Sequence, residues 1–439
     1  MGKTRPNNSR LNRRSFLKRS ATAIAAPMII PGSALGLNGR AAPSERITIG
    51  CIGVGGQGGS NMAAFLALPD TQVVAVCDVD CQRRDAAKSH VDSRYDNSDC
   101  TATTDFRDII ARDDIDAVSI GTPDHWHAIP TIMAAKAGKD VYCEKPLSLT
   151  VEEGRAMVDA VKRYGRVLQT GTWRRSRGGC RRACELVRNG RIGELKTIKI
   201  GVPKGYAIRG GTVEELSRPA EIPPDFDYNM WLGPAPWAPY APGRCHFNFR
   251  WIMDYGEGYI SDWGAHYYDI GQWGNGTDDT GPVFIEARGE FPRDGLYDAP
   301  TDHEIVFTYP NGVKMVSIAT EDASQWGMRF EGTEGWLYVE SDSVKSEPKS
   351  IADSPLGPND IRLYRSDNHH RNFIDCMRSR AETAAPAECG HRSASICHVG
   401  SIALQLGRSL KWDPQAERFV DDKGANRMLS RAKRAPWSA

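Results

Sequence analysis

The sequence predicts an α/β fold in which a domain with a parallel sheet precedes an α+β domain with a large, mostly antiparallel open sheet. Short apolar runs alternate with helical patterns over residues 45–170, which is typical of a doubly wound sheet. Apolar runs separated by tight turns such as Asn311-Gly312 lie between residues 284 and 340, which favours antiparallel pairing. A chain of 439 residues is also too long for one typical core, so we expect two domains, 45–170 and 171–439.

The composition is that of a globular protein with an uneven distribution of charge. Apolar residues make up 40% and charged residues 25%, and the formal net charge is +1. Eight lysines and arginines but no acidic residue precede Glu45, so the rest of the chain has a balance of −7, which argues against a nucleic-acid partner. The eleven cysteines include no Cys-x-x-Cys pair, so we expect free thiols and no metal site.

Residues 1–44 resemble a twin-arginine export signal followed by a linker. Arg13 and Arg14 lie in the sequence NRRSFLK, and the uncharged stretch that follows is interrupted by Pro27 and Pro31. Such a stretch suits the core of a signal peptide better than a membrane span. We therefore expect export to the periplasm or another extracytoplasmic compartment, with a disordered basic tail or an uncleaved anchor as alternatives.

The first strand leads into a glycine-rich turn that is typical of dinucleotide binding. The apolar run Ile47–Ile52 precedes the sequence GVGGQG, and a helix is expected over Ser60–Leu68. In this Rossmann pattern Gly53 permits the tight turn, Gly55 lets the backbone approach a pyrophosphate, and Gly58 lets the helix pack closely. The free N–H groups at the start of the helix then face the phosphate charge.

The second strand carries an acidic residue where the cofactor's ribose would lie. The run Gln72–Val76 is followed by Asp78, about 20 residues beyond Gly58. A carboxylate there accepts both ribose hydroxyls and repels a 2′-phosphate, which favours NAD over NADP. Arg83 and Arg84 just beyond could nevertheless tolerate a 2′-phosphate.

The remaining elements of the first domain bring two polar turns to one edge of the sheet. These turns are Thr122–His127 and Glu144–Pro146, each of which follows a predicted strand. Their candidate cofactor-binding or pocket residues are Thr122, Pro123, His125, His127, Glu144 and Lys145. The predicted helices are Cys81–His90, Phe106–Ala111, Ile129–Ala137 and Val151–Tyr164, and the predicted strands are Ala117–Ile120, Asp140–Cys143 and Val167–Thr170.

The motifs GVGGQG, TPDHWHA and EKPLSLT, with Asp78 between the first two, resemble the glucose–fructose oxidoreductase / inositol dehydrogenase (Gfo/Idh/MocA) family. The resemblance implies a hydride transfer between NAD(P) and a sugar, cyclitol or related secondary alcohol, and a homo-oligomer (dimer or tetramer). It implies that Lys145 is catalytic. An ammonium at the sheet edge could bond the reacting hydroxyl and stabilise charge on its oxygen.

A second motif, DWGAHYYD, supplies the other candidate catalytic groups. On one helix Asp262, His266 and Asp269 would share a face. The resemblance implies that His266 and Asp262 are catalytic, and an imidazole has a pKa suited to accepting the hydroxyl proton. Asp269 is expected mainly to support these residues or to pack the helix, with contact to substrate as an alternative. Without the resemblance, His266 would be interpreted as a core histidine.

Further candidate substrate residues lie outside these motifs. Arg174 and Arg175 follow the last strand of the first domain, and either could bind substrate or pair with carboxylates. The stretch 223–251 is rich in proline and aromatic residues without helical periodicity, so we expect an ordered loop. Most of its aromatics are expected to anchor the loop, with Arg250 and Trp251 as pocket members.

These observations predict an exported NAD(P)-dependent oxidoreductase that acts on a secondary hydroxyl of a sugar, cyclitol or glycoside. The twin-arginine route carries folded proteins, so a cofactor could be loaded before export. An alternative is an NAD-dependent glycoside hydrolase that uses transient oxidation, elimination and water addition. A third interpretation is a sugar sensor in which the cofactor is only structural, although the intact Lys145, Asp262 and His266 argue against it.

Overall fold

The computed structural model describes residue 42, residues 45–340 and residues 342–437. The predicted export signal lies outside these described residues, apart from Ala42. The elements below belong to one compact unit that begins at Ile47. Within the described part of the chain, no helix has the length and apolar character needed to cross a membrane.

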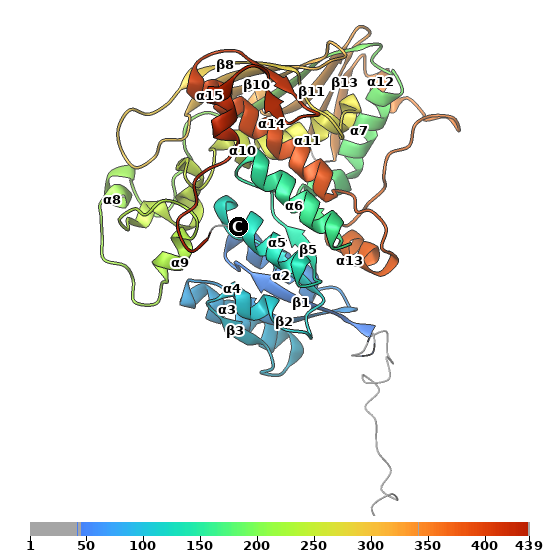
Figure 1. Ribbon diagram of the computed structural model, residues 1–439. Helices are drawn as coiled ribbons and strands as arrows, with labels where there is room; N and C mark the ends of the chain where they lie inside the picture. The colour runs from blue at the N-terminus through green and yellow to red at the C-terminus, as the bar shows by residue number, and fades with distance from the viewer. Residues whose placement is uncertain (1–41, 43–44, 341, 438–439) are drawn as a thin grey trace, which may run out of the picture. The chain divides into compact units, whose positions relative to one another are not determined.

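The first sheet has six parallel strands (Figure 1). This confirms the predicted parallel sheet, although β3 lies where the sequence predicts the end of a polar loop, Asp92–Thr103. Its strand order is β3-β2-β1-β4-β5-β6, so the direction of winding reverses between β1 and β4. Ligands bind at such a reversal, beyond the carboxyl ends of the strands. The strands are β1 (Ile47–Ile52), β2 (Thr71–Cys77), β3 (Thr101–Thr103), β4 (Ala117–Ile120), β5 (Asp140–Cys143) and β6 (Leu168–Thr170).

The helices of this domain begin at capping residues or at the glycine turn. The side chains of Asp80 and Thr150 accept hydrogen bonds from backbone N–H groups at the starts of α3 and α6. Helix α2 begins at Gly56, earlier than the predicted Ser60, because the glycine turn itself forms the first helical turn. The helices are α2 (Gly56–Leu66), α3 (Cys81–Tyr95), α4 (Phe106–Ile110), α5 (Ala128–Lys136) and α6 (Val151–Arg163).

The second sheet has nine strands in the order β13-β12-β11-β7-β10-β9-β8-β14-β15. All its pairs are antiparallel except β7 with β10, which confirms the predicted, mostly antiparallel sheet. The strands are β7 (Leu195–Pro203), β8 (Phe284–Glu290), β9 (Asp302–Thr308), β10 (Lys314–Thr320), β11 (Gly327–Gly332), β12 (Trp336–Glu340), β13 (Ser343–Glu347), β14 (Leu410–Asp413) and β15 (Arg418–Phe419).

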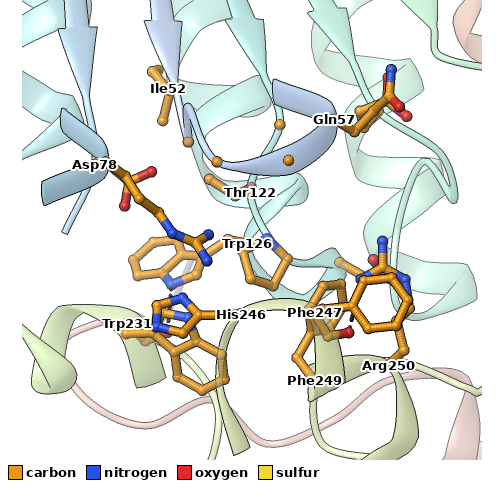
Figure 2. A pocket seen from close by; sticks show the side chains of 18 of the residues that line it. Ile52, Gln57, Asp78, Thr122, Trp126, Trp231, His246, Phe247, Phe249 and Arg250 are labelled. Carbon is orange, nitrogen blue, oxygen red and sulfur yellow. Dashed lines mark hydrogen bonds between the residues drawn. The ribbon is translucent and has the colours of Figure 1, made fainter. Parts of the chain in front are cut away.

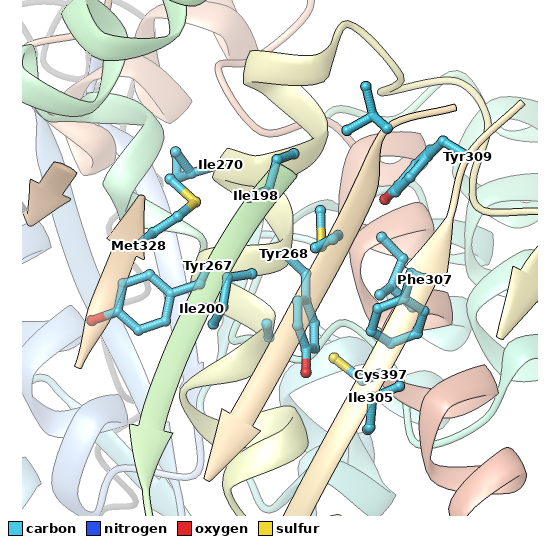
Figure 3. Close-up of a cluster of buried hydrophobic side chains, with 14 of the residues drawn as sticks. Ile198, Ile200, Tyr267, Tyr268, Ile270, Ile305, Phe307, Tyr309, Met328 and Cys397 are labelled. Carbon is cyan, nitrogen blue, oxygen red and sulfur yellow. The ribbon is translucent and has the colours of Figure 1, made fainter. Parts of the chain in front are cut away.

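Helix α11 (Gly264–Asn275) packs tightly on one face of this sheet. A Cβ atom at Gly271 would come within 2.5 Å of Met315 Cε, so glycine permits the close approach. Figure 3 shows the shared core, in which Tyr267, Tyr268 and Ile270 of α11 lie among side chains of β7 and β9: Ile198, Ile200, Ile305 and Phe307. This packing fixes the helix that carries His266.

The other helices connect the two sheets. Helix α14 (Ala387–Leu406) packs against both α11 and α6. Helix α13 (His369–Ser379) belongs to the second predicted domain by sequence, yet Phe373 packs against Phe65 and Tyr142 of the first. The remaining helices are α7 (Gly178–Arg188), α8 (Val213–Ser217), α9 (Tyr228–Leu232), α10 (Tyr259–Asp262), α12 (Ser350–Asp353) and α15 (Lys423–Asn426).

The long connection between β7 and α10, residues 204–258, reaches back to the first domain. Asp80 and Phe226 form an isolated antiparallel bridge. The Cys81 N–H donates to Asp225 O at 2.9 Å, and the Asp227 N–H donates to Val79 O at 2.9 Å. We call residues 225–231 the bridging segment, because they join the second domain to the end of β2.

Candidate active site

The glycine turn lines a cavity on the side where a dinucleotide phosphate would lie. Gly53 has a φ of +74°, and a Cβ atom at Gly58 would overlap the Gly53 carbonyl oxygen. Both positions therefore require glycine. Asp78 faces this turn, because its carboxylate accepts hydrogen bonds from Val54 N at 2.9 Å and Asp80 N at 3.0 Å. Burial raises the pKa of Asp78 despite these bonds.

A cavity of about 790 Å³ extends from this turn to the second domain. Figure 2 shows Asp78, Gln57 and Thr122 of the first domain facing Trp231, His246 and Phe247 from residues 204–258. The predicted site residues that line the cavity are Gly53, Gly55, Asp78, Thr122, Pro123, Glu144, Lys145, Arg174, Arg250, Asp262 and His266. The structure therefore gathers the glycine turn and the candidate catalytic groups around one space.

Lys145 and Asp262 come from different domains and form an ion pair in this cavity. Lys145 Nζ lies 2.7 Å from Asp262 Oδ1 and donates to the Asp262 carbonyl oxygen at 2.8 Å. Arg250 Nε donates to the same Asp262 Oδ1 at 3.1 Å. Burial alone would raise the pKa of Asp262, but the Lys145 and Arg250 cations hold it well below the usual range. Asp262 is thus ionised and fixes the Lys145 ammonium.

His266 lines the same cavity and is held as a neutral imidazole. Burial lowers its pKa well below the usual range, and the nearby Lys145 and Arg174 cations lower it further. Among the described residues, its Nδ1 has no hydrogen-bond partner, and its ring lies 5.7 Å from that of Trp173. A neutral imidazole with an unpartnered nitrogen can accept a proton from a bound hydroxyl.

The predicted continuous helix over DWGAHYYD is interrupted. Asp262 ends α10, Trp263 lies between the helices, and His266 belongs to α11. Asp262 therefore contacts cations rather than the imidazole. Asp269 does not line the cavity: it is 0% exposed, and its carboxylate accepts a hydrogen bond from Arg175 Nε at 2.8 Å. The predicted substrate role of Asp269 needs correction, because Asp269 is one half of a buried ion pair.

The two histidines of the TPDHWH turn have separate positions. His127 is buried outside the cavity, with Nδ1 2.7 Å from Pro146 O and Nε2 2.9 Å from Thr122 O. It therefore ties together the two polar turns of the sheet edge. His125 is also buried, with Nε2 3.0 Å from Trp231 O. Both histidines position cavity walls instead of lining this cavity.

Glu144 holds the catalytic turn in place. Its Oε1 accepts from Asn61 Nδ2 at 2.8 Å, and its Oε2 accepts from the Lys145 backbone N–H at 3.2 Å. Burial raises the pKa of the Glu144 carboxyl. The Glu144 side chain therefore connects helix α2 of the glycine turn to the residue that carries the ammonium.

Of the tentative substrate residues, Arg174 and Arg250 line the cavity and Trp251 does not. Trp251 is 1% exposed and donates its indole N–H to Ala207 O, so it anchors the loop. Arg175, the neighbour of Arg174, pairs with Asp269 and Asp278. The structure thus separates two arginines between which the sequence alone could not choose.

Several cavity residues were not predicted from the sequence. Asp124 lines the cavity, and burial raises its pKa to about 8. Trp173, Arg209 and Phe247 also line it. Asp124 could have been singled out from its place in the TPDHWH turn, whereas the others lie in irregular segments without a periodic pattern.

All eleven cysteines are free, as predicted. Within the described residues, no group of three His, Cys, Asp or Glu side chains is arranged to hold a metal ion.

Two family models match nearly the whole described chain. Residues 47–172 match the model described as "Oxidoreductase family, NAD-binding Rossmann fold". Residues 178–439 match the model described as "Oxidoreductase family, C-terminal alpha/beta domain".

Curated relatives match over a shorter stretch. A "Glycosyl hydrolase family 109 protein" of Shewanella sp. (strain W3-18-1) is 34% identical over 172 residues, which cover 35% of this chain and 37% of the relative. A protein of the same description from Shewanella putrefaciens (strain CN-32 / ATCC BAA-453) matches to the same extent. The chain thus spans little more than a third of the length of these relatives.

Solved structures with low sequence identity share the fold. The WlbA dehydrogenase from Bordetella pertussis, in complex with NADH and UDP-GlcNAcA, has a TM-score of 0.62 at 16% identity and covers 84% of this chain and 99% of its own. Levoglucosan dehydrogenase with NADH and levoglucosan, and aldose-aldose oxidoreductase from Caulobacter crescentus with glycerol, each have a TM-score of 0.61 at 19% identity and cover 83% of this chain and 99% of their own.

Proposed function

Because this chain belongs to the Gfo/Idh/MocA family of oxidoreductases, we propose that it oxidises or reduces a secondary hydroxyl of a sugar, cyclitol or glycoside with a nicotinamide dinucleotide. One observation carries the proposal. Lys145 of the first domain meets Asp262 of the second at 2.7 Å, in the cavity that also contains His266 and the glycine turn. A protein that used its cofactor only as a structural element would not need Lys145, Asp262 and His266 to meet in one cavity.

The glycine turn fits the dinucleotide-binding pattern, because a side chain at Gly53 or Gly58 would collide with neighbouring backbone atoms. When bound, the nicotinamide supplies or accepts the hydride. The neutral imidazole of His266 accepts the hydroxyl proton. Lys145 donates a hydrogen bond to the reacting oxygen and stabilises the negative charge that develops there. Asp262, held ionised by its two cations, keeps the ammonium in place.

NAD is the proposed cofactor, with NADP less favoured. The Asp78 carboxylate lies at the end of β2 and faces the turn, where it would repel a 2′-phosphate. Arg83, which could have offset this repulsion, lies 3.4 Å from the Asp80 carboxylate. Much of its charge is therefore already compensated.

A redox-neutral glycoside hydrolase is the second candidate. The relatives described as glycosyl hydrolase family 109 proteins favour it. So does the bridging segment, because it joins the second domain to the end of β2, which suits a cofactor that stays bound. A ring hydroxyl would be oxidised, the aglycone eliminated, water added and the ketone reduced again, so the cofactor would be unchanged overall.

We also propose that the protein is exported by the twin-arginine route, which the sequence NRRSFLK supports. A homo-oligomer is proposed from the resemblance to the family. A fusion of residues 1–44 to a reporter that folds in the cytoplasm would test export. Replacement of Arg13 and Arg14 by lysine should retain that reporter inside the cell.

The purified full-length protein would distinguish the two activities. Bound dinucleotide is first released by denaturation and identified, and the native protein is then incubated with sugars and aryl glycosides while NMR follows the products. A keto-sugar or net NADH supports the dehydrogenase. A free sugar and aglycone with unchanged cofactor supports the hydrolase. Thermal stabilisation by sugars without any product would overturn both activities and indicate a sensor.

A further inference from the structure

We infer that the substrate carries a carboxylate, as a hexuronic acid or its glycoside does, and that Arg174 binds it. The inference rests on the proposed function, because it assigns the substrate class of the same cavity. It depends on the balance of charge around His266, on the contacts of Arg174, and on a comparison with the two neighbouring arginines.

The cavity has more cationic than anionic side chains near the catalytic groups. Lys145 and Arg250 share one carboxylate, that of Asp262, at 2.7 and 3.1 Å. Arg174 adds a third positive charge. Two other acidic side chains line this region. Glu144 accepts hydrogen bonds from Asn61 Nδ2 and the Lys145 N–H, whereas burial raises the pKa of Asp124 to about 8 and favours its protonated form. Even with Glu144 ionised, three cations therefore face two anions. A neutral sugar would leave this excess of positive charge uncompensated.

Arg174 has no acidic partner among the described residues. Within the described chain, the only hydrogen bond of its side chain is donated by Nη2 to the Tyr267 hydroxyl, at 3.4 Å. Its Nε is buried and has no partner within the described chain. By contrast, Arg175 is paired with Asp269 and Asp278, and the exposed Arg177 lies 3.5 Å from Asp342. Of these three neighbouring arginines, Arg174 alone lines the cavity.

Aromatic rings fix the position of the Arg174 guanidinium. Its central carbon lies 4.6 Å from the centre of the Tyr267 ring and 5.4 Å from that of Trp173. Such stacking limits the rotamers of the side chain, so less conformational entropy is lost when an anion binds. The Trp173 ring also contacts the His266 imidazole at 5.7 Å. The anion site therefore adjoins the proposed reacting carbon.

A carboxylate suits this site because guanidinium N–H groups form paired hydrogen bonds with its two oxygens. A sugar phosphate offers similar anionic oxygens, so it must be tested as a separate source of charge. Neutral sugars of the same stereochemistry are the appropriate reference, because they differ from the uronic acids only at one carbon.

The test measures equilibrium binding to the NAD-loaded protein by calorimetry. The probes are glucuronate with glucose, galacturonate with galactose, mannuronate with mannose, and glucose 6-phosphate. We expect at least one uronate to bind about tenfold or more tightly than its neutral partner, a ratio typical of a charged hydrogen bond. The uronate should also bind more tightly than glucose 6-phosphate.

Arg174→Gln should remove this preference, and Arg174→Lys should restore part of it. Arg177→Gln is the matched control, since Arg177 stacks on the same Trp173 ring at 4.7 Å but is already paired. It should leave the preference unchanged. NAD affinity should be the same in all three variants, and neutral-sugar binding reports whether each variant is folded.

Equal affinities for acidic and neutral partners in the unaltered protein would overturn the inference. Tighter binding of the phosphate, or loss of NAD affinity in Arg174→Gln, would also overturn it, because Arg174 would then serve another anion. These readouts need no turnover. Failure of the proposed function would instead appear as the absence of any product from sugars that bind.

Discussion

Asp262 accepts hydrogen bonds from two cations that come from distant parts of the chain. Lys145 follows β5 of the first domain, and Arg250 ends the aromatic loop of the second. Removing one cation from such a buried cluster leaves the remaining charges poorly balanced. Substitution of each cation can therefore show how much it contributes to binding and how much to turnover, provided that the two are measured independently.

Lys145→Met should lower kcat by about 10²–10³, because it removes one donor to the developing oxyanion. The affinity for dinucleotide should change little, since the glycine turn and Asp78 stay in place. Steady-state rates and a fluorescence titration with NADH would measure the two effects. Lys136→Met on the exposed end of α5 is the control and should leave both unchanged. An unaltered kcat in Lys145→Met would contradict the proposed role.

Asp78→Asn should reduce the preference for NAD over NADP. The substitution keeps an oxygen acceptor for the Val54 or Asp80 N–H but removes the negative charge that repels a 2′-phosphate. We expect NAD to bind more weakly and NADP to bind equally well or better. Titrations with both cofactors provide the ratio of dissociation constants. Equal losses of affinity for both would show that Asp78 supports the fold rather than the cofactor choice.

The sequence identifies Lys145, Asp262 and His266 as neighbours only through the family resemblance of their motifs, since the spacing alone leaves His266 as a core histidine. It could not place Asp269, since helical spacing does not reveal the interruption at Trp263 or the buried partner Arg175. Nor could it separate Arg174 from Arg175, because adjacent residues of an irregular turn carry no periodic pattern.

At the scale of elements, the end of the chain holds the cavity wall. The sequence predicts no chemical role for this tail, residues 425–437 (ANRMLSRAKRAPW). In the structure, the Trp437 ring lies 4.8 Å from that of Trp126, which lines the cavity. Arg434 donates to Asn229 of the bridging segment and to Gly233 just beyond it. The tail thus ties that segment to the first domain.

Trp437→Ala should increase the rate of dinucleotide release severalfold, because the wall formed by Trp126 and the bridging segment loses its support. Displacement of bound NADH by excess NAD, followed by fluorescence, measures this rate. Trp237→Ala is the matched control, since Trp237 lies in the same long connection but is 70% exposed. Equal release rates in the two variants would contradict the role of the tail.

Most elements of the first domain match the structure, because its predicted strands are short apolar runs and its helices have clear apolar patterns. Strands β3, β7, β13, β14 and β15 were not predicted. The last three are short and contain charged residues, which weakens the strand pattern. The sequence predicts a long helix over Ala394–Leu410, whereas α14 begins at Ala387 and ends at Leu406. Its first residues include Glu388 and the buried His391, which form ion pairs with Arg155 and Glu417.

At the scale of the whole described molecule, burial keeps most of the histidines neutral. Of the ten histidines, eight have pKa values lowered by burial, and the values are about 3 for His125 and His369 and about 4 for His127, His246, His303 and His370. His266 and His391 also have lowered pKa values. This condition arises from tertiary packing of both domains, so the linear sequence could not reveal it.

The free energy of unfolding should therefore fall as the pH is lowered from about 6.5 to 4.5. In this window the unfolded chain protonates its histidines at their ordinary pKa of about 6.5, whereas the folded protein does not, so protons favour unfolding. Each such histidine contributes up to about 1.4 kcal/mol per pH unit. Asp124, with a pKa raised to about 8, acts in the opposite direction, and so do four other carboxyls whose pKa burial raises: Asp78, Glu144, Asp269 and Asp298. These five groups are fewer than the eight histidines.

Urea unfolding at pH 7.5, 6.5, 5.5 and 4.5 would measure this dependence on the full chain. His303→Gln provides a test at one site, because His303 is 3% exposed and remote from the catalytic groups. Its imidazole nitrogen lies 3.3 Å from the Ser317 hydroxyl oxygen, so the amide can keep a hydrogen bond. The variant should reduce the slope by up to about 1.4 kcal/mol per pH unit. A stability that is constant or rises toward pH 4.5 would show that the buried histidines accept protons in the folded protein.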